Sequence, residues 1–218
     1  MKSLINRNIK RSIIIGTAQL GENYGISNYN ANYEFSNRID FLNFCYKNGF
    51  HSFDTAYAYK NSHKIIGKWI HNTNCKPKIY TKIPKLNNTN MENIKLIFNR
   101  SIQELKLKNI EGLMLHNPND WLNNNISTFV EDLLKNNLIN SFGLSIYNEN
   151  DMHLNNNIRI IQAPGNIFNQ EIFTSNKINK FYINKGEIHI RSIFIQGLLL
   201  MDQSNIPQKL DELKKPLY

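Results

Sequence analysis

Four residues with acid–base side chains lie where short apolar runs of the sequence end. Asp54 lies at the end of one run and Tyr59 comes five residues later. Lys82 lies near the end of the next run, and His116 ends the third. If these runs are neighbouring parallel strands, the four side chains converge on one pocket. A lysine beside a tyrosine lowers the phenol's pKa from about 10, and an aspartate keeps the lysine charged. Because a histidine can hold a substrate oxygen, the four residues predict acid–base catalysis.

Each of the four residues, taken alone, also has an ordinary structural explanation. An aspartate after a strand often caps a turn, and a tyrosine near a strand end commonly packs half-buried. A single lysine is usually a solvated surface residue, and the histidine, followed by Asn117-Pro118, could satisfy a loop. The combination at three consecutive strand ends is what favours catalysis over these separate explanations.

Seven short runs rich in β-forming residues alternate with helical patterns along the chain. The runs are residues 12–16, 51–55, 78–83, 111–116, 141–146, 159–163 and 187–194. Helical periodicity is present in residues 38–48, 91–107 and 128–137, and Asn61 and Asn148 are suited to cap helices at residues 62–71 and 149–154. Since parallel strands need crossover connections of about this length, the alternation predicts a parallel α/β fold.

Two parallel architectures fit this alternation, a doubly wound sheet and a (β/α)₈ TIM barrel. The first run continues as Gly16-Thr17-Ala18-Gln19-Leu20-Gly21, without the Gly-x-Gly-x-x-Gly turn of a dinucleotide-binding sheet and with no helical pattern directly after it. The barrel interpretation lacks an eighth βα unit, because the sequence stops at Tyr218 soon after the seventh run. No change of composition marks a second domain, so we expect residues 1–218 to form one domain.

The composition excludes several classes of protein. The 218 residues are 41% hydrophobic and 20% charged, as in globular proteins. No apolar run approaches the roughly 20 residues that span a bilayer, and the basic N-terminus lacks the apolar core of a signal peptide. We therefore expect a cytoplasmic protein without a membrane partner, which the two cysteines, Cys45 and Cys75, also suit. The net charge of +9 comes from scattered lysines rather than a basic stripe, so no nucleic-acid partner is expected.

Several motifs, in chain order, resemble those of the aldo-keto reductase family, from residue 13 to about residue 200. Residues 16–21 resemble the family's first strand and loop. Residues 49–56 with Tyr59 are similar to its most specific motif, in which the tyrosine follows the aspartate by five residues. Residues 113–116 resemble the strand that carries the family's histidine. Gly143-Leu144-Ser145, Gln162 and residues 191–199 resemble the fifth, sixth and seventh strand segments.

The resemblance implies a TIM barrel that reduces an aldehyde or ketone with NAD(P)H, with NADP(H) favoured over NAD(H). It also implies that Tyr59 donates the proton and that Lys82 and Asp54 adjust the pKa of Tyr59. His116 would orient the carbonyl of a small substrate. Stabilisation of the oxyanion by Tyr59 and His116 would be the protein's main contribution, while the cofactor supplies the hydride. No metal ligand is implied. The residues implied to contact the cofactor are Thr17, Ser145, Gln162, Arg191, Ser192, Phe194 and Gln196.

The sequence departs from the family pattern in three places. Ile146 stands where the family usually has an asparagine, and Arg191 stands where it often has an aromatic ring against the nicotinamide. The guanidinium of Arg191 could stack or contact a pyrophosphate. The third departure is the missing last βα unit, so we expect a barrel truncated after its seventh strand. Because an open barrel leaves backbone donors and acceptors unpaired at its edges, we also expect lower stability or self-association through those edges.

Two other functions remain open at this point. One is a non-catalytic aldo-keto-reductase-like barrel that binds nucleotide or a partner, and the other is an isomerase or epimerase that moves protons with the same tyrosine and lysine. Retention of Asp54, Tyr59, Lys82 and His116 favours the reductase over the binding module. Carbonyl-dependent consumption of NADPH would separate the reductase from the isomerase.

Overall fold

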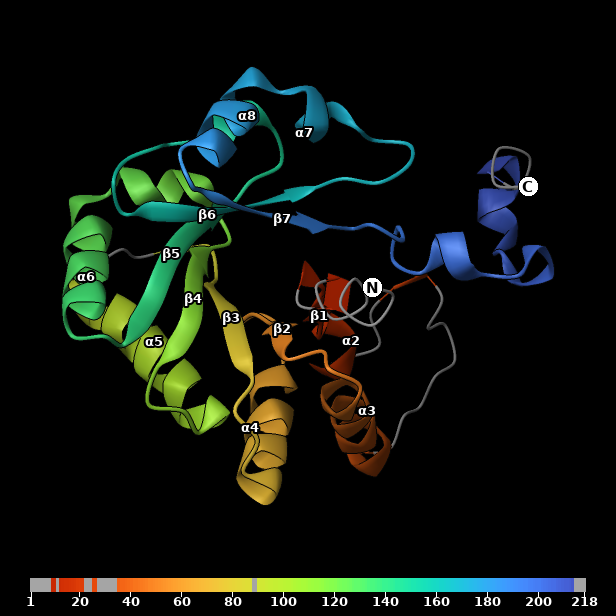
Figure 1. The fold of residues 1–218 in the computed structure, drawn as a ribbon, viewed down its shortest axis with the longest axis horizontal. Coiled ribbons are helices and arrows are strands. Elements are labelled where there is room, and N and C mark those ends of the chain that lie inside the picture. Colours follow the sequence, from red (N-terminus) through yellow and green to blue (C-terminus); the bar gives the residue numbers. More distant parts are fainter. Residues whose placement is uncertain (1–8, 11, 22–24, 27–34, 88–89, 214–218) are drawn as a thin grey trace, which may run out of the picture.

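The described residues form a curled sheet of seven parallel strands, arranged as an open barrel (Figure 1). The structure is a computed structural model that describes residues 9–10, 12–21, 25–26, 35–87 and 90–213. The strands are β1 (Ile14–Gly16), β2 (Ser52–Asp54), β3 (Lys78–Ile83), β4 (Ile110–Leu115), β5 (Ile139–Ser145), β6 (Ile158–Pro164) and β7 (Glu187–Arg191). They pair in sequence order from β1 to β7, which is the order of a barrel rather than of a doubly wound sheet. The barrel prediction is confirmed.

Helices follow the strands and cover the outer face of the sheet (Figure 1). They are α2 (Ala18–Gly21), α3 (Phe35–Lys47), α4 (Ser62–Thr73), α5 (Met91–Leu105), α6 (Asn124–Lys135), α7 (Glu171–Thr174) and α8 (Asn176–Ile183). The long helices bury residues three and four positions apart, for example Ile94, Phe98, Ser101 and Leu105 of α5, as an amphipathic helix does. Among the described residues, no helix has both the length and the apolar character needed to cross a membrane.

The two faces of the sheet carry different side chains because successive residues of a strand point to opposite sides. The outer face belongs to one large apolar core shared with the helices, which includes Phe53, Ile79, Leu113, Phe142 and Ile161. The inner face holds a small separate cluster of Tyr80, Met114 and Ile160. The apolar inner residues fill the floor of the barrel, and the polar site lies nearer the carboxyl ends of the strands.

Two glycines make room for the side chains that fill the inner face. A Cβ at Gly112 would lie 2.5 Å from a ring carbon of Tyr80, and one at Gly143 would lie 2.2 Å from the backbone oxygen of Ile160. A side chain at position 112 would displace the Tyr80 ring, and one at position 143 would displace the backbone of β6. Gly112 therefore makes room for the Tyr80 ring, and Gly143 allows the close approach of β5 and β6.

The structure corrects several local predictions. The helix expected at residues 149–154 is only a 3₁₀ turn at Glu149–Asp151, and Asn61 precedes α4 without a side-chain capping hydrogen bond. Helices α2, α7 and α8 were not anticipated by the sequence pattern.

The last predicted strand also ends early. It stops at Arg191 rather than at residue 194, because Ser192 adopts a left-handed conformation with φ 61°. The described residues after β7 form 3₁₀ turns at Leu198–Leu200, Gln203–Asn205 and Gln208–Leu213 and contain no eighth strand.

Candidate active site

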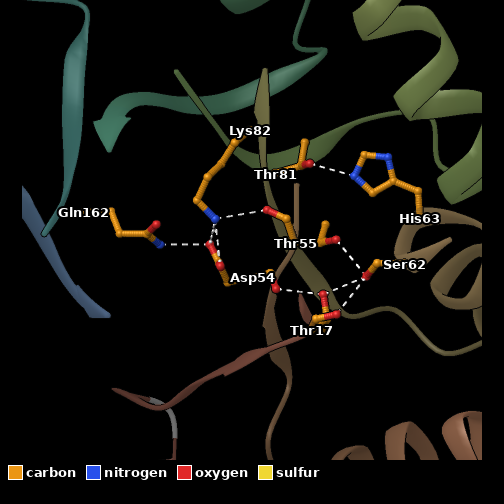
Figure 2. A network of polar contacts seen from close by, with 8 residues as sticks. All are labelled: Thr17, Asp54, Thr55, Ser62, His63, Thr81, Lys82 and Gln162. Atoms are coloured by element: carbon orange, nitrogen blue, oxygen red, sulfur yellow. Dashed lines mark hydrogen bonds and ion pairs between the residues drawn. The ribbon is translucent and has the colours of Figure 1, made fainter. Parts of the chain in front are cut away.

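A buried ion pair between Asp54 and Lys82 lies at the centre of the candidate site (Figure 2). Asp54 is the last residue of β2, and Lys82 lies on β3 two residues beyond Tyr80, the register partner of Asp54. The two side chains therefore project from the same face of adjacent strands. The Nζ atom of Lys82 donates to both carboxylate oxygens of Asp54, at 2.6 and 2.7 Å, and to the backbone oxygen of Thr55 at 3.0 Å.

The charge of Lys82 is held in an unusually buried position. The Lys82 side chain is 1% exposed, and that of Asp54 is 16% exposed. Burial lowers the pKa of Lys82, because a charged ammonium loses hydration there, and the attraction of Asp54 opposes this shift. The three hydrogen bonds satisfy all three protons of the ammonium group, so the pair is fully hydrogen-bonded on the lysine side.

Tyr59 and His116 lie next to this ion pair. The Nζ atom of Lys82 is 5.5 Å from the centre of the Tyr59 ring. The Tyr59 and His116 rings meet edge to face, with centroids 6.1 Å apart and planes inclined by 70°. The structure thus brings together all four residues that the sequence singled out as an acid–base set.

His116 is held neutral by its surroundings. It directly follows β4, where its backbone N–H donates to the backbone oxygen of Ile83 at 2.9 Å. Burial, together with the nearby positive charge of Lys82, lowers the pKa of His116 to about 4. At neutral pH its imidazole therefore carries one N–H that can donate a hydrogen bond without a positive charge.

The backbone of the loop between β2 and α4 positions Tyr59. The Tyr59 N–H donates to the backbone oxygen of Ala56 at 3.0 Å, and the Tyr59 backbone oxygen accepts from the N–H of Ser62 at 2.9 Å. Gly21 of α2 packs directly on this loop, since a Cβ at position 21 would lie 1.9 Å from the Tyr59 backbone oxygen. The tyrosine backbone is thereby fixed from both sides.

A network of hydroxyl groups supports the same loop from the outer side of the sheet (Figure 2). The Oγ1 atom of Thr17 donates to the backbone oxygen of Asp54 at 2.9 Å, and it lies 2.9 Å from the Oγ atom of Ser62. Ser62 in turn lies 3.0 Å from the Oγ1 atom of Thr55. Sequence reasoning assigned Thr17 to the cofactor and missed Ser62 and Thr55. In the structure the Thr17 hydroxyl is fully buried and bonded within the protein, and its cofactor role stays a prediction.

Gln162 joins the ion pair from the opposite side of the inner face. Its Nε2 atom donates to the Oδ1 atom of Asp54 at 2.9 Å, which fixes the orientation of the amide, because a carboxylate only accepts. The Oε1 atom of Gln162 is buried and has no hydrogen-bond partner among the described residues. Ser145, buried at the end of β5, is the register partner of Gln162. The two residues thus present an unused acceptor and a hydroxyl on neighbouring strands.

Arg191 ends β7 and contacts the residues that follow β5. Its Nη2 atom donates to the backbone oxygen of Ile146 at 3.1 Å, and its guanidinium carbon lies 4.7 Å from the centre of the Tyr147 ring. The other expected cofactor residues, Ser192, Phe194 and Gln196, follow β7 in an exposed segment. The structure does not place these three among the buried polar side chains around Lys82.

Two further buried or nearly buried histidines lie close to the candidate site. The Nε2 atom of His63, on α4, lies 2.8 Å from the Oγ1 atom of Thr81, on the outer face of β3. His189 of β7 packs edge-on against Tyr80, with ring centroids 4.9 Å apart. Neither was predicted, because a single histidine inside a strand or helix pattern has no distinctive spacing. Within the described part of the chain, no group of three or more His, Cys, Asp or Glu side chains is placed to hold a metal ion.

The parallel strand order and the charged side chains at the carboxyl ends of the strands are the arrangement found in α/β-barrel enzymes. The sequence comparison identifies the family within this class. Residues 12–205 match the model of the aldo/keto reductase family, and the chain belongs to that family. No curated protein sequence matches the chain significantly.

Solved structures of aldo-keto reductases share this fold. The chain superposes on a Pseudomonas aeruginosa protein classed as an aldo-keto reductase with a TM-score of 0.70 and 17% identity, covering 92% of this chain and 80% of the other. For the glycerol dehydrogenase of Gluconobacter oxydans the TM-score is 0.70, with 16% identity over 91% of this chain and 65% of the other. An aldo/keto reductase from Klebsiella pneumoniae, solved with NADP and acetate, gives a TM-score of 0.70 and 13% identity over 94% and 72% of the two chains. At these identities the similarity establishes the fold alone.

Proposed function

We propose that this chain reduces an aldehyde or ketone with a nicotinamide cofactor, with Tyr59 as the proton donor. The observation that carries the proposal is the buried Lys82–Asp54 pair with the Tyr59 and His116 rings beside it. A buried, fully hydrogen-bonded ammonium is costly for a fold to keep, and sites of this kind are typical of catalysis. Membership of the aldo/keto reductase family supports this chemistry.

The four residues have separate roles in this proposal. Tyr59 gives its hydroxyl proton to the carbonyl oxygen as negative charge develops there. The positive charge of Lys82 favours the phenolate that Tyr59 then becomes, and Asp54 keeps Lys82 charged and in place. His116, neutral at pH 7, donates a hydrogen bond to the same carbonyl oxygen and orients it.

The residues on β5 and β6 fit the carboxamide of a nicotinamide. The unpaired Oε1 atom of Gln162 can accept from the carboxamide NH₂ group, and the hydroxyl of Ser145 can donate to its oxygen. When bound, the nicotinamide supplies the hydride. Neighbouring structures crystallised with NADP and NADPH support NADP(H) over NAD(H) for this chain. Ile146, in place of the family's asparagine, leaves the carboxamide with these two partners.

The test is carbonyl-dependent oxidation of NADPH by the purified chain, followed by its absorbance, for the wild type and Tyr59→Phe. We expect Tyr59→Phe to reduce turnover about 10²- to 10⁴-fold, because one positioned acid contributes that much. NADPH affinity, measured by fluorescence quenching, should change little because Gln162 and Ser145 hold the carboxamide. Tyr182→Phe is the matched control, since Tyr182 lies on α8 with its side chain 67% exposed. Near-wild-type turnover of Tyr59→Phe would show that the four residues are structural here.

A further inference from the structure

Arg191 lies at the mouth of the barrel, one layer above the polar residues of the site. On β7, His189 is the register partner of Gln162, and Arg191 is the partner of Pro164. His189 faces the inside of the barrel, where it packs against Tyr80. Because alternate residues of a strand share a face, Arg191 belongs to the same inner face as His189, two residues nearer the carboxyl end.

The guanidinium of Arg191 is oriented by two contacts, and neither of them pairs its charge with a carboxylate of the described residues. Its Nη2 atom donates to the backbone oxygen of Ile146 at 3.1 Å, and its carbon lies 4.7 Å from the Tyr147 ring centre. Both contacts hold the plane of the group, yet neither supplies a negative charge. The ion pairs formed by the described residues do not include Arg191. A guanidinium has five N–H groups, so the remaining donors are available to a ligand.

The charges around the carbonyl position add up to an excess of positive charge. Lys82 is paired with Asp54, and His116 is neutral at pH 7 because burial and the nearby positive charge of Lys82 keep its pKa at about 4. Arg191 also contributes to that lowering and to the lowered pKa of Lys82, so its charge acts on both residues. Since Arg191 also shares the inner face of the sheet with His189, the register partner of Gln162, an anion bound by Arg191 would lie on the same side of the sheet as the groups assigned to the reacting carbonyl.

We propose that the substrate is a carbonyl compound bearing a carboxylate or phosphate, and that Arg191 binds this anionic group. The inference rests on the proposed reductase function and narrows its substrate class. A planar guanidinium matches a carboxylate or phosphate through two parallel hydrogen bonds, which a lysine cannot reproduce. The Tyr147 ring and the Ile146 carbonyl orient the guanidinium group before an anion binds. The resemblance to the family suggested a cofactor contact for Arg191, so the cofactor phosphates are the competing source of the anion.

The test compares matched pairs of substrates in four proteins. The pairs are succinic semialdehyde and its methyl ester, 4-carboxybenzaldehyde and its methyl ester, and glyceraldehyde 3-phosphate and glyceraldehyde. The proteins are the wild type, Arg191→Met, Arg191→Lys and the control Arg159→Met, in which an exposed arginine of β6 loses the same charge. For each protein, kcat/KM, NADPH affinity and the melting temperature are measured.

We expect the wild type to prefer the anionic member of at least one pair. Arg191→Met should lower kcat/KM for that anion roughly 10- to 100-fold, the usual range for a hydrogen bond to a charged group, and change the neutral partner about twofold or less. Arg191→Lys should fall between the wild type and Arg191→Met, since it keeps the charge but loses the planar fork. NADPH affinity and the Arg159→Met values should match the wild type.

Three results would overturn the proposal. Equal losses for charged and neutral substrates with weaker NADPH binding would assign Arg191 to the cofactor phosphates. Equal losses of kcat/KM for charged and neutral substrates, with unchanged NADPH binding and a lower melting temperature, would show that Arg191 only stabilises the end of β5. A wild type with no preference for the anion in any pair would also contradict it.

A chain that reduces none of these carbonyls fails as a reductase, and binding then tests the anion site separately. Calorimetric titration of the wild type and Arg191→Met with succinate, benzoate and inorganic phosphate provides that readout. Binding by the wild type that Arg191→Met loses would support the anion site. Equal binding by both proteins, or no binding by either, would reject it.

Discussion

Two polar networks lie back to back on strands β2 and β3, and they differ in charge and in completeness (Figure 2). The outer one is neutral and links Thr17, Thr55 and Ser62, with His63 bonded to Thr81 beside it. The inner one is charged and links Asp54, Lys82 and Gln162. Adjacent residues along a strand, Asp54 and Thr55 or Thr81 and Lys82, belong to opposite networks because the strand alternates its faces.

The difference in completeness separates a structural role from a functional one. Each hydroxyl of the outer network is bonded within the protein, as expected of polar groups that a fold buries for its own stability. The inner network leaves the Oε1 atom of Gln162 without a hydrogen-bond partner. At the mouth of the barrel, Arg191 forms no ion pair with a carboxylate of the described residues. A buried acceptor without a partner reduces stability, so its presence inside the charged network is best explained by a ligand that binds there.

The largest expected effect comes from breaking the inner network at Lys82. Lys82→Met should lower turnover about 10²- to 10⁴-fold, because Tyr59 loses the positive charge that favours its phenolate. The melting temperature should fall as well, because the methionine leaves the largely buried Asp54 carboxylate without its counter-charge, so turnover is compared at a temperature where both proteins are folded. Lys95→Met, an exposed change on α5, is the control. Turnover within threefold of the wild type, measured as NADPH oxidation, would remove Lys82 from the catalytic set.

The outer network should make the protein sensitive to acid through His63. Burial, with a smaller contribution from Lys82, lowers the pKa of His63 from 6.5 to about 4. The unfolded chain therefore takes up this proton more readily, so the stabilisation is present above about pH 6.5 and is lost as the pH falls towards 4. At about pH 4.5 the loss for this group amounts to roughly 2–3 kcal/mol.

Urea unfolding at pH 7.5 and 4.5 measures this linkage. His63→Gln, which does not titrate, should lose less stability between the two pH values than the wild type, while its turnover at pH 7.5 stays close to normal. His116 has a similarly lowered pKa, so the double variant with His116→Gln should flatten the profile further. The same pH dependence in His63→Gln and the wild type would show that His63 does not contribute to it.

A smaller loss of stability, with turnover preserved, is expected from Ser62. Its hydroxyl is fully buried and lies within hydrogen-bond distance of the hydroxyls of Thr17 and Thr55 and of the Thr17 backbone oxygen. Ser62→Ala should reduce the free energy of unfolding by about 1–3 kcal/mol, because it leaves buried partners unsatisfied. Ser127→Ala on α6, where the hydroxyl bonds at an exposed site, should cost less. A loss of turnover in the folded Ser62→Ala protein would contradict the division between the two networks.

The sequence predicts the inner network far better than the outer one. Asp54, Lys82 and His116 come at the ends of successive strands, so parallel topology alone brings them to one edge. Thr17, Thr55 and Ser62 are small polar residues on three elements, and nothing in their spacing indicates that they meet. Their contacts depend on how α2 and α4 pack against β2, which only the three-dimensional structure gives.

The point where β7 ends could not be predicted from the sequence either. The apolar run at residues 187–194 reads as one strand, but the left-handed backbone at Ser192 ends it after Arg191. The pairing of Arg191 with Tyr147 depends on how two strand ends meet, and a sequence pattern carries no information about that distance.

The smallest expected effect concerns Gln162, and it tests whether the unsatisfied acceptor is a ligand group. Gln162→Met removes the Oε1 atom that the nicotinamide carboxamide would use, together with the bond from Nε2 to Asp54. NADPH affinity should fall about 2- to 10-fold, the value of one neutral hydrogen bond. Turnover at saturating NADPH should remain within a few-fold, because both bonds from Lys82 to Asp54 are kept. Gln103→Met, an exposed change on α5, is the matched control. If Gln162→Met binds NADPH as tightly as the wild type but unfolds at a lower temperature, Gln162 belongs with the structural residues and the contrast between the two networks fails at this position.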